Sequence, residues 1–274
     1  MKTDDAESFE ILTRTVSARA GLALQNYKDK CLRRRVQVRM RVCGVHTFDE
    51  YLHYLENHPP ELELLVDALT INVTKFYRNV ETWARLSESV LPGLLTGNTR
   101  EVRVWSAGCA SGEEPYSIAM VFADVAERLG CPGRLGRVHI DATDIDSESL
   151  IQAQEACYLD GAFSEAPVGT APRFCTRNPD GRWRVSDTLR RRVRVSRVDL
   201  LLDPPPAPPY DLIMCRNVII YLDRPSQDRL MEGFHRALGP GGVLVLGKVE
   251  TLLGASRQRF DPLDVRERIF RRLG

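Results

Sequence analysis

From about residue 101 onward, short apolar strands alternate with amphipathic helices, and this alternation limits the possible folds more than any other feature of the sequence. Apolar runs at 101–107, 137–143, 210–215 and 242–247 are predicted to be buried strands. Apolar side chains at helical spacing lie between them, at 118–129, 147–156 and 230–238. Such alternation predicts a mainly parallel sheet with helices on both faces. The last run, 267–272, follows a short connection, so we expect it to be antiparallel.

The first 95 residues or so lack this alternation and are predicted to be helical. Phe9, Leu12 and Val16 recur on one helical face, and Leu32 and Val36 recur on another. Thr-Phe-Asp-Glu at 47–50 matches a capping box. We therefore predict an N-terminal helical domain over 1–78 and an α/β domain over 79–274, with a small inserted β subdomain at about 159–192. The glycines and proline at 239–242 are predicted to form a tight turn into the last parallel strand.

Composition and charge argue against several classes of function. Lys and Arg total 38 against 37 Asp and Glu, and a net charge of +1 is unlike that of a nonspecific nucleic-acid binder. No apolar run is long enough to span a membrane, and the first residues lack the apolar core of a signal peptide, so we expect a cytoplasmic protein. The seven cysteines are scattered without CxxC spacing or a histidine cluster, so we expect no metal site.

The chemistry is expected at the carboxyl ends of the parallel strands, where ligands of such sheets bind. The turn after the first strand carries Gly108 and Gly112, followed by Glu113 and Glu114. It lacks the third glycine of the dinucleotide fingerprint, and two carboxylates would repel a pyrophosphate. They suit a ligand with an ammonium group, such as the amino-acid end of S-adenosylmethionine. A glycine turn with solvated acids is the alternative explanation.

Two further strand ends carry acidic residues. Asp144 ends the second predicted strand, where an acid can accept hydrogen bonds from both ribose hydroxyls, and Asp146 is predicted to be a helix N-cap. Asp199 and Leu200 follow a further predicted strand, which lies between the runs at 137–143 and 210–215, in an arrangement in which the acid can accept from an adenine amino group. An ordinary exposed aspartate is an equally good explanation of Asp199 on the sequence alone.

Four motifs in this order resemble the chemotaxis receptor glutamate methyltransferases (the CheR family) over nearly the whole chain. They are LTINVTKFYR at 69–78, WSAGCASGEEPYS at 105–117, ATDID at 142–146 and YDLIMCRNVIIYLD at 210–223. The resemblance implies an N-terminal helical domain followed by a class I, Rossmann-like methyltransferase domain. It also implies S-adenosylmethionine as the cofactor, with S-adenosylhomocysteine as product, and O-methylation of glutamate side chains on the cytoplasmic coiled-coil domain of a methyl-accepting chemoreceptor. We expect a monomer that binds no nucleic acid and does not insert into a membrane.

The resemblance also assigns roles to individual residues. It implies that Arg78 and Tyr221 form the active-site pair. The residues that it places around the cofactor are Asn72, Thr74, Arg78, Gly108, Glu114, Asp144, Asp199, Leu200, Arg216 and Asn217. One departure from the family is at 247–250, where Gly-Lys-Val-Glu stands in place of the common Gly-His-Ser-Glu. Glu250 matches the family, whereas Lys248 and Val249 stand in place of the histidine and serine, so a role of those two side chains does not carry over to this chain.

Seven basic residues gather within 28–41. A solvated helix face is the usual explanation of such a run, and few interleaved aromatic residues argue against nucleic-acid binding. The resemblance implies a docking face for glutamate-rich receptor helices, and the residues predicted to dock the substrate are Arg33, Arg34, Arg35, Arg39 and, in the β subdomain, Arg177. The hairpin at 177–182, Arg-Asn-Pro-Asp-Gly-Arg, has a single glycine, so we predict recognition of the methylation helices without a tether to the receptor's C-terminal peptide.

Two other functions remain open on the sequence alone. A methyltransferase of the same fold could act on another protein or on a small acid. A cofactor-binding signalling module could have lost catalysis, although the retained Arg78 and Tyr221 argue against this.

Overall fold

The computed structural model describes residues 2–70, 74–97 and 101–274. The chain divides into two compact units. One comprises Met1–Asn72 with Tyr221–Gln227, and the other comprises Val73–Ile220 with Asp228–Gly274. Across the described residues, no helix is both long and apolar enough to cross a membrane.

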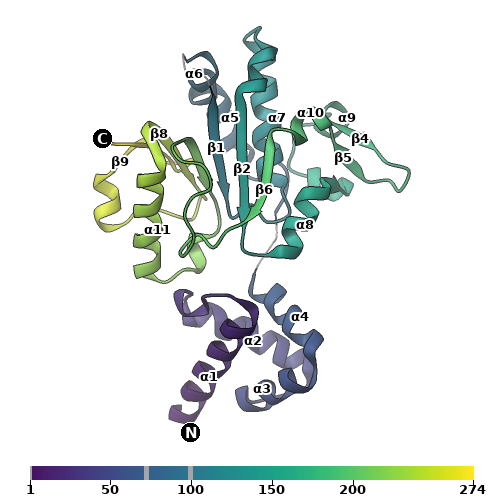
Figure 1. The fold of residues 1–274 in the computed structure, drawn as a ribbon, viewed down its shortest axis with the longest axis vertical. Coiled ribbons are helices and arrows are strands. Elements are labelled where there is room, and N and C mark those ends of the chain that lie inside the picture. The colour runs from purple at the N-terminus through teal and green to yellow at the C-terminus, as the bar shows by residue number, and fades with distance from the viewer. Residues whose placement is uncertain (1, 71–73, 98–100) are drawn as a thin grey trace. The chain divides into compact units, whose positions relative to one another are not determined.

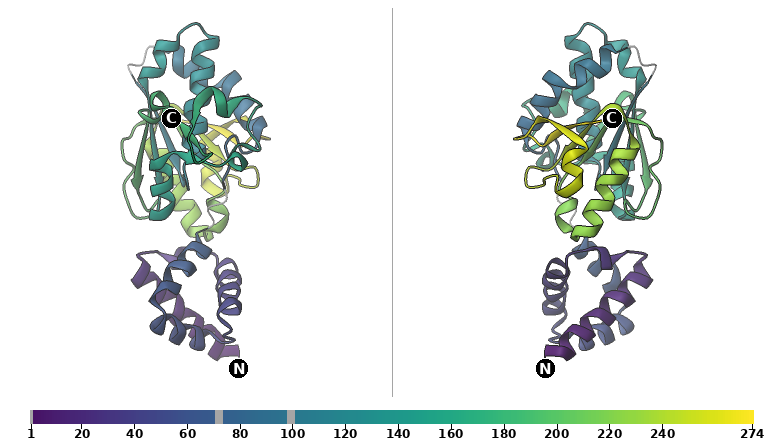
Figure 2. Two further views of the ribbon diagram at one scale, coloured as in Figure 1. Left: turned by 90° about the vertical axis from the view of Figure 1, so that its right-hand side faces the viewer. Right: turned by 90° about the vertical axis from the view of Figure 1, so that its left-hand side faces the viewer.

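The first unit is built from amphipathic helices, coloured purple to blue in Figures 1 and 2. They are α1 (Lys2–Ala20), α2 (Asp29–Cys43), α3 (Phe48–Asn57) and α4 (Pro59–Leu69), with a 3₁₀ turn η1 (Leu24–Asn26). The apolar residues that the helical spacing placed on inner faces are buried, namely Phe9, Leu12, Val16, Leu32 and Val36. The predicted capping box begins α3, since the Thr47 side chain accepts from the Glu50 N–H and the Glu50 carboxylate accepts from the Thr47 N–H.

The second unit is built around a seven-stranded sheet with the order β6-β2-β1-β7-β8-β10-β9. Its strands are β1 (Val102–Ala107), β2 (Val138–Asp144), β6 (Val193–Arg197), β7 (Tyr210–Cys215), β8 (Leu238–Leu246), β9 (Phe260–Asp264) and β10 (Ile269–Arg272). The first five strands pair in parallel, whereas β10 is antiparallel to both β8 and β9. The predicted α/β class and the antiparallel last strand are confirmed.

Helices cover both faces of this sheet (Figure 1). The remaining helices outside the β subdomain are α5 (Val80–Ser89), α6 (Leu91–Thr96), α7 (Glu113–Arg128), α8 (Ser147–Glu155) and α11 (Arg224–Ala237), and the 3₁₀ turns are η2 (Pro132–Arg137), η4 (Ile219–Tyr221) and η5 (Gly254–Gln258). Tyr221 at the end of η4 and residues 224–227 at the start of α11 group with the first unit. Val104 of β1 packs in one core cluster with α5, α6 and α7. The next residue, Trp105, points to the opposite face, where its ring centroid lies 5.5 Å from that of Phe234 in α11.

The inserted β subdomain is a three-stranded antiparallel sheet of order β3-β5-β4. Its elements are β3 (Cys157–Tyr158), η3 (Asp160–Phe163), α9 (Thr170–Phe174), β4 (Cys175–Arg177), β5 (Trp183–Val185) and α10 (Asp187–Arg190). The small sheet expected in this part of the chain is therefore present.

The prediction of a tight turn at 239–242 is wrong, because these residues belong to strand β8. Tyr210 pairs with Leu238 and Leu212 pairs with Val243, so a step of two residues in β7 lies opposite a step of five in β8. A Cβ atom on Gly242 would lie 3.0 Å from the carbonyl oxygen of Tyr210. Gly242 is thus needed for a bulge inside the strand rather than for a turn before it.

Candidate active site

The turn after β1 brings the backbone close to its neighbours. Gly108 has a φ of +84°, and a Cβ atom there would lie 2.4 Å from Cγ2 of Val218. Gly112 has a φ of +98°, and its Cβ atom would lie 2.7 Å from the hydroxyl oxygen of Tyr158. Both positions therefore require glycine. The Gly108 N–H donates to the carbonyl of Thr143 at 2.8 Å, which joins this turn to the end of β2.

Glu114, in the first turn of α7, is buried beside the end of β1. One carboxylate oxygen accepts from the Ser106 hydroxyl at 2.8 Å, and the other lies 3.6 Å from Nη1 of Arg216. Burial raises the pKa of Glu114, and the nearby Arg216 and Ser106 partly offset this. A buried carboxylate of this kind is a strong acceptor for a cationic N–H donor.

Arg216 directly follows β7, and only 3% of its side chain is exposed. Nη2 donates to the carbonyl of Arg78 and to the side-chain oxygen of Asn79, at 2.8 Å each. The guanidinium carbon lies 5.6 Å from the ring centroid of Trp83. Its Nε is buried without a hydrogen-bond partner among the described residues. An unsatisfied buried donor is costly, so this atom indicates a bound acceptor.

Asn217 continues this edge of the site with a φ of +63°, and its side-chain oxygen is also buried without a partner in the described part of the chain. The loop that carries it is fixed by Glu250, which is 3% exposed. Oε2 of Glu250 accepts from the N–H groups of Asn217 at 3.0 Å and Gly247 at 2.6 Å. Oε1 accepts from Ile219 at 2.8 Å and Ile220 at 3.3 Å. The retained Glu250 thus organises the loop after β7.

Asp144 lies at the end of β2, close to the glycine turn. Oδ2 accepts from the N–H of Ala110 at 2.8 Å, and Oδ1 accepts from Ile145 at 2.7 Å and Asp146 at 3.1 Å. Burial raises the pKa of Asp144, and these three N–H groups act in the opposite direction. A carboxylate has about four acceptor positions, so one remains for a ligand hydroxyl. Asp146 caps α8 through the Glu148 N–H, as predicted.

The other residues predicted to bind the cofactor are less constrained. The Asp199 N–H donates to the Asp203 carboxylate at 2.8 Å, so the segment after β6 forms a closed local turn that includes the half-buried Leu200. Thr74 is partly exposed. Asn72 lies outside the described residues.

The predicted active-site pair falls in two different units. Arg78 belongs to the unit with the large sheet, whereas Tyr221 groups with the helical unit. The Tyr221 carbonyl accepts from the Lys28 N–H at 2.8 Å, and the guanidinium carbon of Arg35 lies 4.5 Å from the Tyr221 ring centroid. No local pattern in the sequence signals this attachment, because Tyr221 lies far along the chain from α2.

The arginines of α2 that were predicted to dock the substrate have different surroundings. Arg39 forms a two-point ion pair with the buried Glu61, at 2.9 and 2.6 Å, and the Tyr51 hydroxyl donates to the same carboxylate at 2.7 Å. Arg33 is paired with Asp29 at 2.8 Å. Arg34 is exposed. Arg39 therefore forms an ion pair within the helical unit, whereas Arg34 lies on the surface of that unit.

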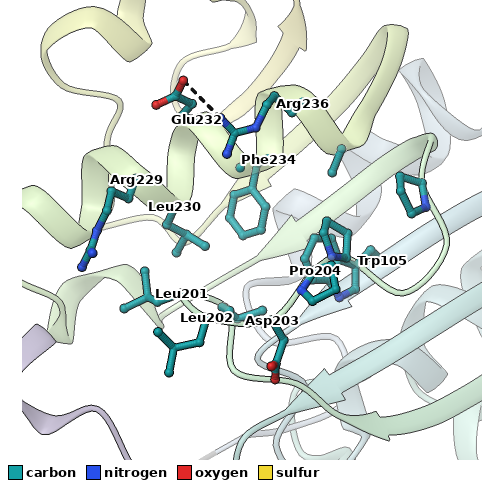
Figure 3. Close-up of a pocket in the computed structure, with 15 residues that line it drawn as sticks. Trp105, Leu201, Leu202, Asp203, Pro204, Arg229, Leu230, Glu232, Phe234 and Arg236 are labelled. Atoms are coloured by element: carbon teal, nitrogen blue, oxygen red, sulfur yellow. Dashed lines mark ion pairs between the residues drawn. The ribbon is translucent and has the colours of Figure 1, made fainter.

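A cavity of about 540 Å³ lies on the α11 side of the sheet (Figure 3). Residues 198–209, all of them described, cross from β6 to β7 without a helix, and the cavity lies between this crossover and α11. Trp105, Leu201 and Phe234 are among its lining residues. Its lining includes Leu200 but no other described residue predicted for the cofactor, so this cavity is not the predicted site.

Both parts of the chain match models of one protein family. Residues 7–70 match the CheR methyltransferase all-alpha domain, and residues 72–269 match the CheR methyltransferase SAM binding domain. The chemotaxis protein methyltransferase of Klebsiella aerogenes is 34% identical over 91% of this chain and 84% of its own length. That of Escherichia coli is 32% identical over 91% of this chain and 86% of its own length.

Two further proteins show more limited similarity. A 104.1 kDa protein of Rhodobacter capsulatus is 32% identical over 98% of this chain, which spans only 28% of that relative's length. A solved SAM-dependent methyltransferase from Corynebacterium glutamicum is similar with a TM-score of 0.38 at 14% identity, over 71% of this chain and 94% of that one.

These matches confirm the predicted family and the predicted cofactor. The family model for the cofactor domain covers well over half of the chain, and several relatives exceed 30% identity over most of both sequences. The chain is therefore an S-adenosylmethionine-dependent methyltransferase that belongs to the CheR family.

Proposed function

We propose that this enzyme transfers a methyl group to glutamate side chains on the cytoplasmic coiled-coil domain of a chemoreceptor, forming methyl esters. One observation carries the proposal. Arg216 and Asn217 each hold a buried polar atom without a partner among the described residues, beside the buried carboxylate of Glu114. One donor (Nε of Arg216) and two acceptors (the Asn217 amide oxygen and the Glu114 carboxylate) match a ligand that has both a carboxylate and an ammonium group, which are the groups of an amino acid.

The described residues fit the cofactor at three places. Glu114 would accept from its ammonium group, and the Nε of Arg216 would donate to its carboxylate. The free acceptor position of Asp144 would bind a ribose hydroxyl. Asp199 and Leu200 would contact the adenine ring, and Thr74, Arg78 and Gly108 would line the same pocket. When bound, the cofactor supplies a methyl group on a positively charged sulfur.

The substrate carboxylate needs no general base. A glutamate side chain has a pKa of about 4.3 in water, so it is already ionised and nucleophilic at neutral pH. It needs aim and removal from water. The guanidinium of Arg78 offers a fixed fork for a carboxylate, and the hydroxyl of Tyr221 can orient it by one further hydrogen bond. Arg78 must hold the carboxylate only loosely, because the attacking oxygen loses its charge as the ester forms.

We further propose that substrate docking uses the outer face of α2 rather than the β subdomain. Lys30, Arg34 and Arg41 are exposed on α2, and positive charge there would speed encounter with glutamate-rich helices. In the β subdomain, Arg177 is paired with Asp160 at 3.3 Å. The hairpin beside it is closed by a hydrogen bond from the Asn178 N–H to the Arg182 carbonyl at 2.8 Å, which leaves little free backbone for a tether peptide.

Incubation with labelled S-adenosylmethionine and a chemoreceptor cytoplasmic fragment tests this function. We expect base-labile label on glutamates of the fragment, and turnover that falls at least tenfold in Arg78→Ala with unchanged unfolding behaviour. Deleting the last few residues of the receptor should leave the rate within about twofold. Label on other residue types would refute glutamate as the substrate, and a large loss on truncation would refute the tether-independent docking. We also expect a monomer by light scattering, and no methylation of nucleic acid.

A further inference from the structure

The segment that begins with Tyr221 is attached to the chain just before α2. The Tyr221 carbonyl accepts from the Lys28 N–H at 2.8 Å, and the Asp223 N–H donates to the Asn26 carbonyl at 2.9 Å. Between them, Tyr27 and Leu222 form an antiparallel bridge. Because Lys28 is the N-cap of α2, this attachment places the Tyr221 backbone at the start of that helix.

Arg35 completes the attachment from within α2. Its guanidinium carbon lies 4.5 Å from the Tyr221 ring centroid, and its Nη1 donates to the carbonyl of Leu69, the last residue of α4. One side chain thus contacts the ring of Tyr221 and the end of the helix that leads, along the chain, into the segment carrying Thr74 and Arg78. Contact with a carbonyl at a helix C-terminus is favourable for a cation.

We propose that Arg35 is a positioning residue, which restricts the ring of Tyr221 and thereby fixes where its hydroxyl lies. This inference rests on the proposed function, in which that hydroxyl orients the substrate carboxylate. It gives Arg35 a role other than the predicted docking, because the guanidinium is held against a carbonyl and an aromatic ring of the helical unit.

The chemistry of the contact explains why an arginine is needed. A planar guanidinium can stack on the ring and donate in its own plane to the carbonyl at the same time, whereas a lysine ammonium can satisfy only one of these contacts well. Loss of the stack frees the ring to rotate about its side-chain bonds. A displacement of about 1 Å at a reacting centre can lower turnover about a hundredfold, so a modest contact can have a large kinetic effect.

The experiment compares kcat and the receptor KM for the full chain and its variants, at saturating cofactor. We expect Arg35→Ala to lower kcat about tenfold or more, with the receptor KM within twofold of the wild-type value. Arg34→Ala, on the exposed face of α2, should instead leave kcat unchanged and raise the receptor KM by an amount that depends on salt. Arg14→Ala removes another surface arginine, paired with Glu10, and should change neither parameter. Arg35→Lys keeps the charge and one donor, and should still lower kcat at least threefold.

A double-mutant comparison separates positioning from a general structural effect. In a Tyr221→Phe background the hydroxyl is absent, so Arg35→Ala should lower kcat by less than twofold. An equal tenfold loss in both backgrounds, or a raised receptor KM with wild-type kcat, would overturn the positioning role. If the Arg35→Ala variant does not fold, Arg35→Lys is compared in the wild-type and Tyr221→Phe backgrounds instead. An equal loss of kcat in both backgrounds would again overturn the positioning role. A wild-type enzyme that fails to methylate the receptor would instead refute the proposed function, and the role of Arg35 with it.

Discussion

Replacing Glu250 with glutamine tests the inference that one carboxylate organises the loop after β7. The native carboxylate accepts from four backbone N–H groups, two on each oxygen. An amide has one oxygen and one NH₂ group, so it can accept from only one of these pairs. The shortest contact, 2.6 Å, is to Gly247, so the amide oxygen is expected to remain with the N–H groups of Gly247 and Asn217. Its nitrogen would then face the N–H groups of Ile219 and Ile220.

The cost follows from the two donors left without an acceptor. A buried unsatisfied donor costs about 1–3 kcal/mol, which gives roughly 2–6 kcal/mol for the two. Part of this is offset because burial raises the pKa of Glu250, so the native carboxylate itself carries a desolvation penalty that glutamine lacks. We therefore expect Glu250→Gln to lower the free energy of unfolding by about 2–4 kcal/mol.

Tryptophan fluorescence during urea unfolding is a suitable assay, because Trp83, Trp105 and Trp183 all lie in the unit that contains Glu250. Glu232→Gln is a matched control, since Glu232 on α11 is about half exposed and pairs with Arg236, and exposed pairs contribute less than about 1 kcal/mol. A Glu250→Gln variant as stable as this control would refute the reasoning.

Three further predictions concern the cofactor site and the helical unit. Glu114→Gln should weaken S-adenosylhomocysteine binding by about 1.5–3 kcal/mol in calorimetry. Because burial raises the pKa of Glu114, wild-type affinity should fall as the pH is lowered, starting above the usual glutamate range, and this part of the pH dependence should vanish in the variant. Asp144→Asn should weaken binding of the same product by about 1.5–3 kcal/mol, and unchanged affinity would contradict the ribose role. Arg39→Ala should destabilise the helical unit by roughly 2–4 kcal/mol in circular dichroism melts, because Glu61 is left buried without its cation; an effect below about 1 kcal/mol would show that the pair is dispensable.

The features that the sequence predicted well are those set by local pattern. The strand at Tyr210–Cys215 is a continuous apolar run, and its bounds agree with the prediction. The capping box at Thr47 and the N-cap at Asp146 are fixed by residues two or three positions away, so they were visible without a fold. The bulge in β8 was not visible in this way, because Gly242 is required by its close approach to the carbonyl of Tyr210 on a neighbouring strand.

The candidate site was predictable to the extent that parallel strands end at one edge of a sheet. Glu114 and Arg216 follow different strands, and the structure brings them to 3.6 Å. The roles of Ser106 and Glu250 had no signal of this kind. Ser106 lies inside β1 and is recognisable only through its contact with Glu114, and Glu250 is 33 residues from Asn217, whose N–H it accepts.

The basic run at 28–41 shows how helical phase could have refined the prediction of the docking surface. Leu32, Val36 and Met40 form the buried stripe of α2, four residues apart. Arg35 and Arg39 lie three positions after members of this stripe, which puts them on its flank, within reach of α4. Arg34 lies two positions after Leu32, about 200° around the helix, and must face outward. Charge alone makes these arginines equivalent, whereas their phase separates those that hold the helical unit together from those that remain available to a partner.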